Sequence, residues 1–451
     1  MTTSAHFSHS PDQLRDLADQ VLSIARDKGA TDCVMEASEG SGLSVAVRMG
    51  RVETIEQNRD KGLSVTVYQG ARKGYASTAD FSRKALEDTV QAAYDIARYT
   101  AEDVAAGLPD DDQLETSPRD LGLFHEWNLD VETAIELTSR AEAAALATDP
   151  RIRNSEGASI SAQHSHFVLA NSRGFIGGYP YSRHYISCAP IAQHRRAMQR
   201  DDWYSSQRDP KALAAPEAIG RYAAQRALAR LGARSVPTRK CPVLFEAPLA
   251  CGLLGAFTQA AAGSALYRKS TFLLESLGQR VFADHVGILE DPHVQGGMGS
   301  APFDEEGVRT VRREVVSAGV VNGWFLSTYS ARKLGLKTTG NAGGSHNLSL
   351  VSSKTHEADN LDVMLRKLGT GLFVTELMGQ GVNYVTGDYS RGASGYWVEN
   401  GQIVHPVEEV TIAGNLKQMF QSIVAIGADT LVRGSNETGS ILIEQMTVAG
   451  T

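Results

Sequence analysis

Pairs of histidine and glutamate are the first candidates for chemistry, because a zinc peptidase helix carries two histidines four residues apart with a glutamate beside the first. The chain has two His-Glu pairs, His125-Glu126 and His356-Glu357, and neither is followed by a histidine four or five residues later. We interpret both pairs as surface features. The sequence therefore predicts no zinc-binding helix of this kind.

Two further pairs of residues could do chemistry. His164 and His166 lie two apart in an expected strand, so they share a face and could hold a metal, although solvent-facing histidines are the favoured interpretation. Ser330 and Lys333 form a Ser-x-x-Lys sequence, in which the lysine could act as the base for a serine nucleophile. A helix-capping serine beside a solvated lysine is favoured there.

The densest cluster of glycine and polar residues spans Gly369–Gly401. Glycine lets the backbone approach a ligand closely, and a set of tight β-turns is the alternative interpretation. No residue is assigned a catalytic or metal-binding role. Gly379, Gln380, Gly381, Asp388, Tyr389 and Arg391 of this cluster are candidates for contact with a ligand.

An α+β fold must position these residues, with a mixed helix and antiparallel-sheet N-terminal half and a β-rich C-terminal half with inserted helices. Apolar periodicity predicts helices, and alternation between Gly-bearing turns predicts an antiparallel meander. The predicted helices span 10–30, 81–100, 131–147 and 215–233; the meander spans 42–77, and a strand block runs from about 153 to 200.

We predict an N-terminal α/β region over 1–235, with a polar linker near 108–120, and a C-terminal β-rich domain over 236–451. The stretch Pro248–Gly263 has no charge and no histidine, and its length and apolarity are those of a buried helix. Asn322-Gly323 and Asn400-Gly401 supply the two positive-φ residues of a type I′ turn, so both predict hairpins.

Composition excludes several classes of protein. The 451 residues include 52 acidic and 44 basic side chains, a net charge of −8 that argues against direct, sequence-independent binding to nucleic acid. No secretory signal and no uninterrupted apolar run long enough to span a membrane is present. The four cysteines are far apart in the sequence, which indicates reduced thiols and a cytoplasmic location.

Several stretches closely resemble the TldD/PmbA family, on its PmbA (TldE) branch. They are "TELMGQGVNYVTGDYSRGASGYWVENGQIVHPVEEVTIAGNLKQMF", "YRKSTFLLESLGQRV", "APFDEEGVRTVRRE", "STYSARKLGLKTTGNAGGSHN" and "NRDKGLSVTVYQGARKGYAS". The resemblance covers nearly the whole chain. It implies a bacterial, cytosolic metalloprotease family, also called modulators of DNA gyrase and implicated in peptide-antibiotic maturation and antitoxin degradation.

The resemblance also suggests the origin of the apolar helix expected at Pro248–Gly263. The sister subunit TldD carries H-E-x-x-x-H in this helix, and here Leu254, Gly255 and Gln259 occupy those places, with Thr438 near the position of a further cysteine ligand. The resemblance thus implies that the zinc belongs to a TldD-type partner and that this chain holds no cofactor. This chain would then shape a shared chamber that admits extended peptide, with exposed strand edges in the β-rich half available to add a substrate strand. The candidates that the resemblance implies for lining this substrate chamber are Gln259, Arg268, Lys269, Gly379, Gln380, Gly381, Asp388, Tyr389 and Arg391.

Three functions remain open from the sequence. The chain is the non-catalytic partner of a zinc peptidase, a self-sufficient peptidase with an unrecognised site, or a non-enzymatic regulator that binds DNA gyrase or another protein. The physiological substrate is not specified by the residues. The chain alone could be a monomer or a homodimer.

Overall fold

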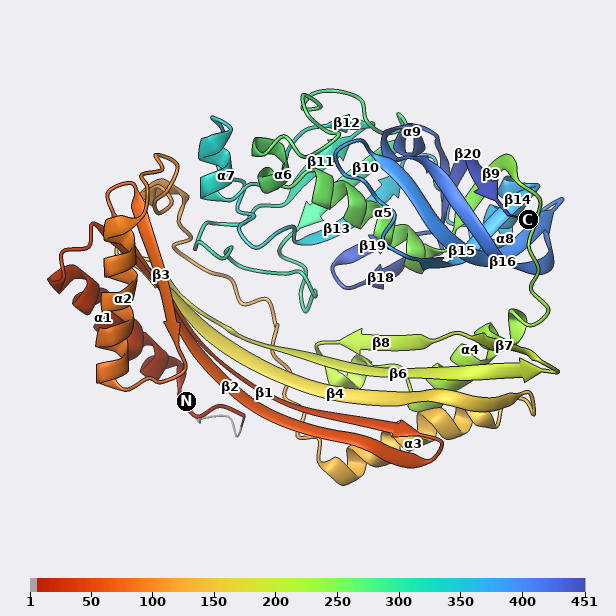
Figure 1. Ribbon diagram of the computed structural model, residues 1–451, viewed down its shortest axis with the longest axis horizontal. Coiled ribbons are helices and arrows are strands. Elements are labelled where there is room, and N and C mark those ends of the chain that lie inside the picture. Colours follow the sequence, from red (N-terminus) through yellow and green to blue (C-terminus); the bar gives the residue numbers. More distant parts are fainter. Residues whose placement is uncertain (1–5, 451) are drawn as a thin grey trace.

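Alternating apolar residues build a long, curved sheet in the N-terminal half, shown in the computed structural model, which describes residues 6–450 (Figure 1). Its strand order is β3-β2-β1-β4-β6-β7, with β5 paired to β4 and β8 paired to β6. The strands are β1 (Asp32–Arg48), β2 (Arg51–Gln69), β3 (Arg72–Thr78), β4 (Ile152–Asn171), β5 (Ile176–Gly177), β6 (Pro180–His194), β7 (Ala197–Arg200) and β8 (Trp203–Gln207). The pairs β1–β2 and β2–β3 are antiparallel, so the predicted meander is confirmed.

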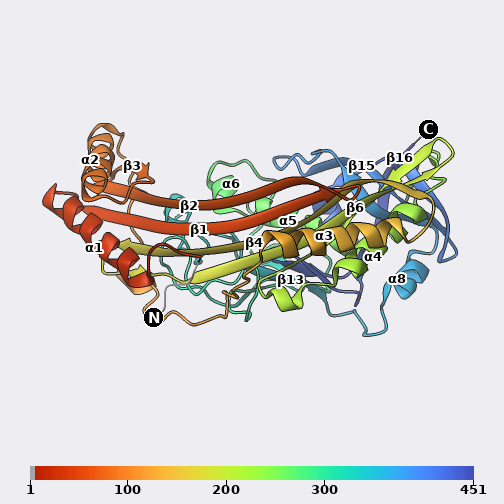
Figure 2. The same cartoon turned by 90° about the horizontal axis from the view of Figure 1, so that it is seen from below.

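Four helices cover one face of this sheet. Alternate residues of β1 point toward these helices and are buried. The helices are α1 (Pro11–Asp27), α2 (Arg83–Tyr99), α3 (Val131–Leu146) and α4 (Pro216–Ala229). Met35 packs in a cluster with α1 and α2, whereas Val45 packs in a cluster with α3 and α4. Between them Glu39 and Ser41 form a polar belt on the same face. Figure 2 shows α1 and α3 spread along the length of this side.

The ends of these helices follow local capping chemistry. Ser10 accepts a hydrogen bond from the Gln13 backbone N–H, and the Gln13 side chain accepts one from the Ser10 backbone, which is a capping box. Asp130 accepts a hydrogen bond from the backbone of Thr133 in the same way at α3. All four helices predicted for this half are confirmed, with ends that differ by a few residues because helix termini are poorly marked in sequence.

Two six-stranded sheets form the C-terminal half. The first has the order β12-β11-β10-β13-β19-β18, and the second has the order β16-β15-β14-β9-β20-β17 with β16 also paired to β20. The strands of the first are β10 (Val286–Asp291), β11 (Arg313–Ser317), β12 (Val320–Val321), β13 (Asn347–Ser352), β18 (Leu431–Arg433) and β19 (Asn436–Thr438). Those of the second are β9 (Arg239–Phe245), β14 (Gly371–Met378), β15 (Asp388–Glu399), β16 (Gln402–Asn415), β17 (Ile423–Ile426) and β20 (Ile441–Ala449).

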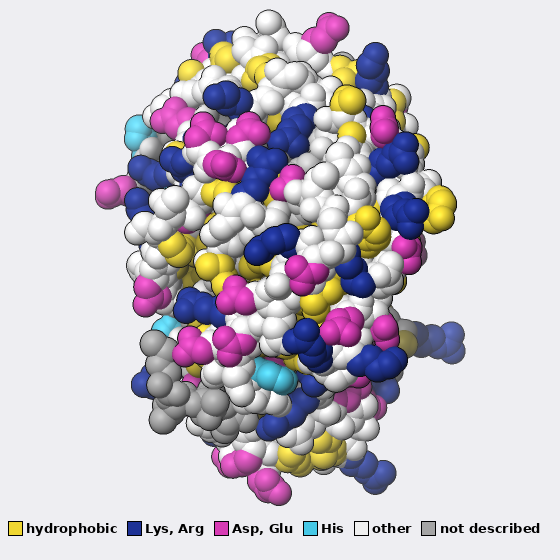
Figure 3. Space-filling model, turned by 90° about the vertical axis from the view of Figure 1, so that its left-hand side faces the viewer, with side chains coloured by type: hydrophobic (Ala, Val, Ile, Leu, Met, Phe, Trp, Pro, Cys, Tyr) yellow, Lys and Arg dark blue, Asp and Glu magenta, His cyan; other side chains and the backbone are white. Residues whose placement is uncertain are grey.

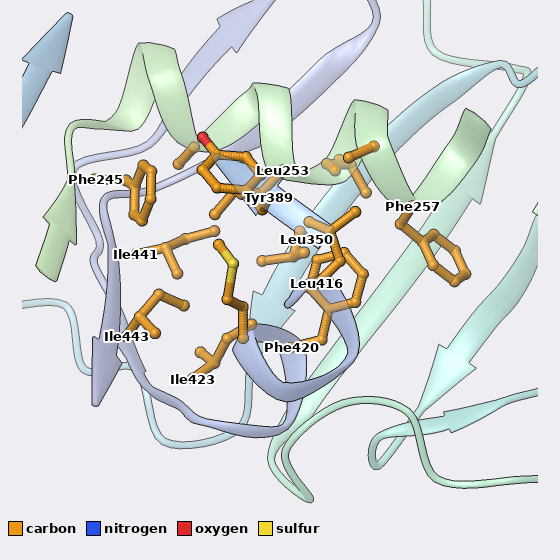
Figure 4. Packing of buried hydrophobic residues seen from close by; sticks show 14 of the residues in the cluster. Phe245, Leu253, Phe257, Leu350, Tyr389, Leu416, Phe420, Ile423, Ile441 and Ile443 are labelled. Carbon is orange, nitrogen blue, oxygen red and sulfur yellow. The ribbon is translucent and has the colours of Figure 1, made fainter. Parts of the chain in front are cut away.

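Inserted helices complete this half, so the predicted α+β class is confirmed. They are α5 (Ala247–Ala260), α6 (Gly263–Tyr267), α7 (Thr328–Lys333), α8 (Leu361–Leu368) and α9 (Leu416–Gln421). α5 packs into the main core with residues of both sheets (Figure 4). The ring of Phe257 meets that of Phe282 edge-on with their centroids 5.2 Å apart, and Phe282 stacks on Phe420 at 4.5 Å.

The two hairpin predictions had different outcomes. Asn400-Gly401 does form the turn between β15 and β16, with φ of 51° and 75°. Asn322-Gly323 does not: the turn lies at Ala318-Gly319, with φ of 48° and 79°. The local turn preference of Asn-Gly is overridden there, because the observed register pairs Val316 with Val321 and buries both.

The β-rich half has both short and long strands at its sheet edges. β12, β17 and β18 are short, whereas β16 has 14 residues and pairs with β20 only from Thr411 to Ala413. A longer edge lies in the N-terminal half, because β3 pairs with β2 only from Leu63 to Gln69 and no described strand pairs with 51–62 on that side. An unpaired edge of this length is a template for adding another strand.

The surface around α1 and α2 carries acidic and basic side chains interspersed, as Figure 3 shows for that end of the molecule. A basic surface of the kind that grips nucleic acid is not visible on this face. Within residues 6–450 no helix is both long and apolar enough to cross a bilayer.

Candidate functional site

The apolar helix α5 is part of the core, as its composition predicts. Leu253, Leu254 and Phe257 are buried, whereas Gly252 and Gln259 are exposed on the other side of the helix. The helix begins after Glu246, which occupies its N-cap position, and ends before Gly263. It packs against β18 and β19, so the strand that carries Thr438 does lie beside this helix.

The side chains of α5 do not fit a zinc ion. Leu254 is 0% exposed and belongs to the core, Gly255 has no side chain, and Gln259 is exposed and offers an amide. The buried hydroxyl of Thr438 donates to the carbonyl of Gly439 at 3.2 Å. Across residues 6–450, no three His, Cys, Asp or Glu side chains are grouped so that they could hold a metal ion.

Cys251 is the thiol nearest to these positions in the helix, and its environment makes it inert. Its Sγ donates to the carbonyl oxygens of Leu431 at 3.8 Å and Asn436 at 3.6 Å. Burial raises the pKa of Cys251 to about 11. A thiol that stays protonated is neither a metal ligand nor a nucleophile at neutral pH.

His164 and His166 lie on the same face of β4, but that face is buried, so the solvent-facing interpretation is wrong. His164 is 2% exposed, stacks on His6 with ring centroids 3.8 Å apart, and accepts a hydrogen bond at Nε2 from the Trp127 backbone. His166 Nε2 lies 3.2 Å from a Glu39 oxygen. The polar belt of the sheet is thus covered by residues 6–9 and by the segment before α3 that contains Trp127. The imidazole of His164 hydrogen-bonds to a backbone N–H and that of His166 to a side chain.

The buried state of His164 predicts an acid-sensitive fold. Burial, with smaller effects from the charges of His6 and His184, lowers the pKa of His164 to about 3. The unfolded chain therefore binds a proton between about pH 6.5 and 3 that the folded chain does not, so stability falls as pH falls through this window. His164→Gln keeps an acceptor for Trp127 and should reduce the loss of stability between pH 7 and pH 5 by about 1–2 kcal/mol.

Thermal denaturation of both proteins at the two pH values measures this effect. His194, an exposed histidine on the other end of β6, provides the matched control His194→Gln. Equal pH dependence in the His164→Gln variant and the parent would show that His164 does not contribute.

Ser330 and Lys333 do not form a nucleophile and base pair. Ser330 Oγ is hydrogen-bonded to Ser327, the N-cap of α7, in a capping box. Lys333 Nζ instead donates to Asp103 Oδ1 at 2.8 Å, across the boundary between the two halves. The capping interpretation is therefore wrong for both residues, since Ser327 rather than Ser330 is the N-cap and Lys333 is ion-paired with Asp103.

The glycine cluster around 379–391 is mainly a set of turns. Tyr389 is buried in the core, and Gly381 is required because a Cβ there would lie 1.5 Å from the Ser390 carbonyl. Gly379 and Gln380 lie at the exposed end of β14, and Asp388 accepts a hydrogen bond from Thr386. Arg391 is partly buried beside Tyr389.

Arg268 and Lys269 end α6 on the surface, and Arg268 lies over the ring of Tyr267. Together with Gln259 and the glycine cluster they make nine candidates, none of which lines the cavities between the two halves described below. The nine residues therefore lie outside these three cavities, and their place in a substrate chamber stays a prediction.

Three cavities lie where the N-terminal sheet meets the C-terminal half. The first, of about 340 Å³, is lined by β1, β4 and β6 on one side and by 301–305 and 342–346 on the other. The second, of about 420 Å³, lies between β8 and the strands β13, β18 and β19. The third, of about 390 Å³, lies at the start of α5. Sequence reasoning missed these residues, although the three consecutive acids Asp304–Glu306 were a visible signal.

A buried ion-pair network joins the two halves at the third cavity. Arg226 of α4 donates to Glu246 at 2.6 Å and lies 3.2 Å from Asp201. Arg230, one turn later, pairs with Asp201 and with Glu376 of β14. The guanidinium of Arg226 also lies over the ring of Trp203, at 5.2 Å from its centroid. These contacts fix how α5 meets the N-terminal sheet.

Three family models match consecutive segments of this chain. They describe the first domain, the central domain and the C-terminal domain of PmbA/TldA metallopeptidases, and they match residues 36–97, 124–231 and 238–450. The chain belongs to the PmbA/TldD metallopeptidase family.

Relatives within the PmbA/TldD family are similar over most of their length. The metalloprotease PmbA of Escherichia coli O157:H7 is 47% identical over 95% of this chain and 94% of its own. A PmbA homologue of Haemophilus influenzae is 42% identical over 97% and 96%. A metalloprotease TldD homologue of the same organism is 21% identical over 81% of this chain and 78% of its own.

Solved structures of the PmbA/TldD family share the fold. A protein of Bacteroides thetaiotaomicron, named as a candidate modulator of DNA gyrase, has a TM-score of 0.91 at 28% identity and covers 98% of this chain and 100% of its own. TldE of Thermococcus kodakarensis has a TM-score of 0.84 at 17% identity, covering 96% and 100%, which supports the fold alone.

Proposed function

We propose that this chain is the non-catalytic, PmbA/TldE-type subunit of a cytoplasmic zinc peptidase, and that a TldD-type partner supplies the metal. In this proposal the chain forms part of a chamber that admits extended peptide or unfolded segments. Peptide-antibiotic precursors and antitoxins are the substrate classes that the family resemblance suggests.

The observation that carries the proposal is the chemistry of α5. Leu254, Gly255 and Gln259 stand where the sister subunit has His, Glu and His, and their side chains are buried and apolar, absent, or a neutral amide. Zinc peptidase chemistry needs three protein ligands and an open position for water. The helix α5 packs in the core, so we infer that its role in this subunit is structural.

The shape of the N-terminal sheet supports a role in peptide binding. The face of this sheet opposite the helices is turned toward the C-terminal half (Figure 1). Alternation along β1 and β4 places small or polar side chains on that face, such as Ser38, Ser161, Gln163 and Ser165. The open edge of β2 over 51–62 could accept either a peptide strand or a strand of the partner. Strand addition binds through the backbone and makes little demand on sequence, which suits an unfolded substrate.

The self-sufficient peptidase gains no support from the geometry, because Ser330 and Lys333 are engaged with different partners. A regulator of DNA gyrase is suggested by the names of two structural neighbours. No described surface of this chain favours it specifically.

Metal analysis of the purified chain tests the proposal. We expect far less than one zinc per chain after purification without chelator, because α5 provides no ligand set. About one zinc per chain would contradict the proposal, and its loss in a His164→Ala/His166→Ala variant would place the metal at β4.

A further inference from the structure

The cavity of about 340 Å³ between the two halves has an unusual chemical character. Its N-terminal wall is the exposed face of β1, β4 and β6, and its C-terminal wall is formed by Phe303–Glu305 and the turn 342–346. The residues that line it include three carboxylates and no lysine or arginine. An acidic, concave site inside the chamber would favour a group of opposite charge on a peptide.

Aromatic rings form one side of this cavity. The ring of Phe167 meets that of Tyr179 edge-on, with centroids 4.8 Å apart, and Phe303 meets Tyr179 at 5.5 Å. Tyr181 lies 6.5 Å from Phe167 by the same measure. The faces of such rings attract cations, because the ring quadrupole is negative on its face.

Two carboxylates of the cavity have no partner in the described chain. Glu36 of β1 and Glu305 make no side-chain hydrogen bond and no ion pair with residues 6–450. Burial, followed by the charge of Glu305, raises the pKa of Glu36. Neighbouring carboxylates without a cation repel each other, and a positive group between them would relieve this.

The other charged or titratable groups near the cavity are already engaged with the backbone. Asp304 is committed to the backbone N–H groups of Glu306, Val308 and Ala342. The buried guanidinium of Arg208, whose charge acts on Tyr179, donates to carbonyl oxygens of Ser182, Gly297 and Met298 and forms no ion pair with a residue of the described range 6–450. His346 Nε2 donates a hydrogen bond to the Gly340 carbonyl at 2.9 Å.

The C-terminal wall is fixed before any ligand arrives. The buried carboxylate of Glu290 accepts hydrogen bonds from the Asn341 side chain at 2.7 Å and from the His346 backbone at 2.9 Å. Gly343 has a φ of 93° in this turn, a backbone conformation that favours glycine. A preformed wall reduces the entropic cost of binding.

We propose that this cavity binds a positively charged group of a peptide, either the ammonium of a lysine side chain or that of a peptide N-terminus. The aromatic rings would contact the methylene groups and the cation, while Glu36 and Glu305 would accept hydrogen bonds from the ammonium. The inference rests on the proposed function for the presence of peptide in the chamber, and it names the feature of the peptide that is recognised.

Peptide binding to the full chain alone, without partner and without cleavage, tests the proposal. Three short fluorescent peptides of one sequence serve as probes: one with a central lysine and an acetylated N-terminus, one with norleucine in place of lysine, and the norleucine peptide with a free N-terminus. Fluorescence anisotropy at low salt gives the dissociation constants. We expect at least one cationic peptide to bind about tenfold more tightly than the neutral one.

The variant Glu36→Gln/Glu305→Gln keeps the shape of the cavity and should abolish this preference, whereas Glu132→Gln, an exposed carboxylate on α3, should leave it unchanged. Thermal denaturation checks that each variant is folded. Equal affinity for all three peptides, or an unchanged preference in the double variant, would overturn the proposal. Because this experiment measures binding and no cleavage, failure of the proposed subunit role would appear separately, when cleavage by this chain mixed with a TldD-type partner is measured.

Discussion

Replacing Arg226 with methionine is expected to lower the free energy of unfolding by about 3–5 kcal/mol, because one partner of a buried ion pair is removed. The guanidinium of Arg226 is only 13% exposed and donates to Glu246 at 2.6 Å. Methionine would fill much of the space but would leave the Glu246 carboxylate without its partner. The midpoint of chemical denaturation, monitored by circular dichroism, measures the loss.

Two variants separate this effect from general damage. Arg226→Met/Glu246→Gln removes both charges and should recover a large part of the lost stability, because no charge is left buried and unpaired. Arg140→Met breaks a more exposed pair with Glu217 and should cost less than about 1 kcal/mol. A similar cost for Arg140→Met and Arg226→Met would show that burial of the network is not the cause.

Introducing the H-E-x-x-x-H motif of the sister subunit into α5 is not expected to create a zinc site. The variant Leu254→His/Gly255→Glu/Gln259→His replaces a fully buried core leucine by an imidazole, which should cost about 2–5 kcal/mol. Leu254 faces the core, and Thr438 offers a hydroxyl where a further thiolate ligand would be needed, so the ligand set stays incomplete. The variant should melt at lower temperature, bind no stoichiometric zinc and cut no peptide by itself.

The double variant Gly255→Glu/Gln259→His is the matched control, since both positions are on the less buried side of α5. It should be much closer to the parent in stability than the triple variant. Tight zinc binding together with unaided peptide cleavage by the triple variant would show that the chamber is already a complete active site. The division of labour between two subunits would then be wrong.

Much of the fold could be predicted from the sequence because its signals are local. Ser10 and Asp130 mark helix starts by capping, alternation in 42–77 marks the meander, and Asn400-Gly401 marks a type I′ turn. The error at Asn322-Gly323 arose because burial of paired valines, which depends on distant strands, outweighed the turn preference.

The candidate site was harder to predict, because it depends on which distant segments meet. The absence of zinc ligands at Leu254, Gly255 and Gln259 could be derived from residue identity once the resemblance was recognised. The acidic cavity could not, since Glu36 and Glu305 come together only when the N-terminal sheet meets the C-terminal half. The glycines at 379–391 do not distinguish a ligand site from a set of turns, because glycine serves both tight turns and ligand contacts.

Peptide cleavage by reconstituted subunits tests the central claim most directly. This chain, a purified TldD-type partner and their mixture are each incubated with an unfolded peptide substrate, and cleavage is followed with and without a zinc chelator. The subunit account predicts no cleavage by this chain alone, chelator-sensitive cleavage by the mixture, and loss of that cleavage when the Glu of the partner's H-E-x-x-x-H motif is changed to Gln. Chelator-sensitive or chelator-resistant cleavage by this chain alone, or a mixture no more active than the partner alone, would contradict it.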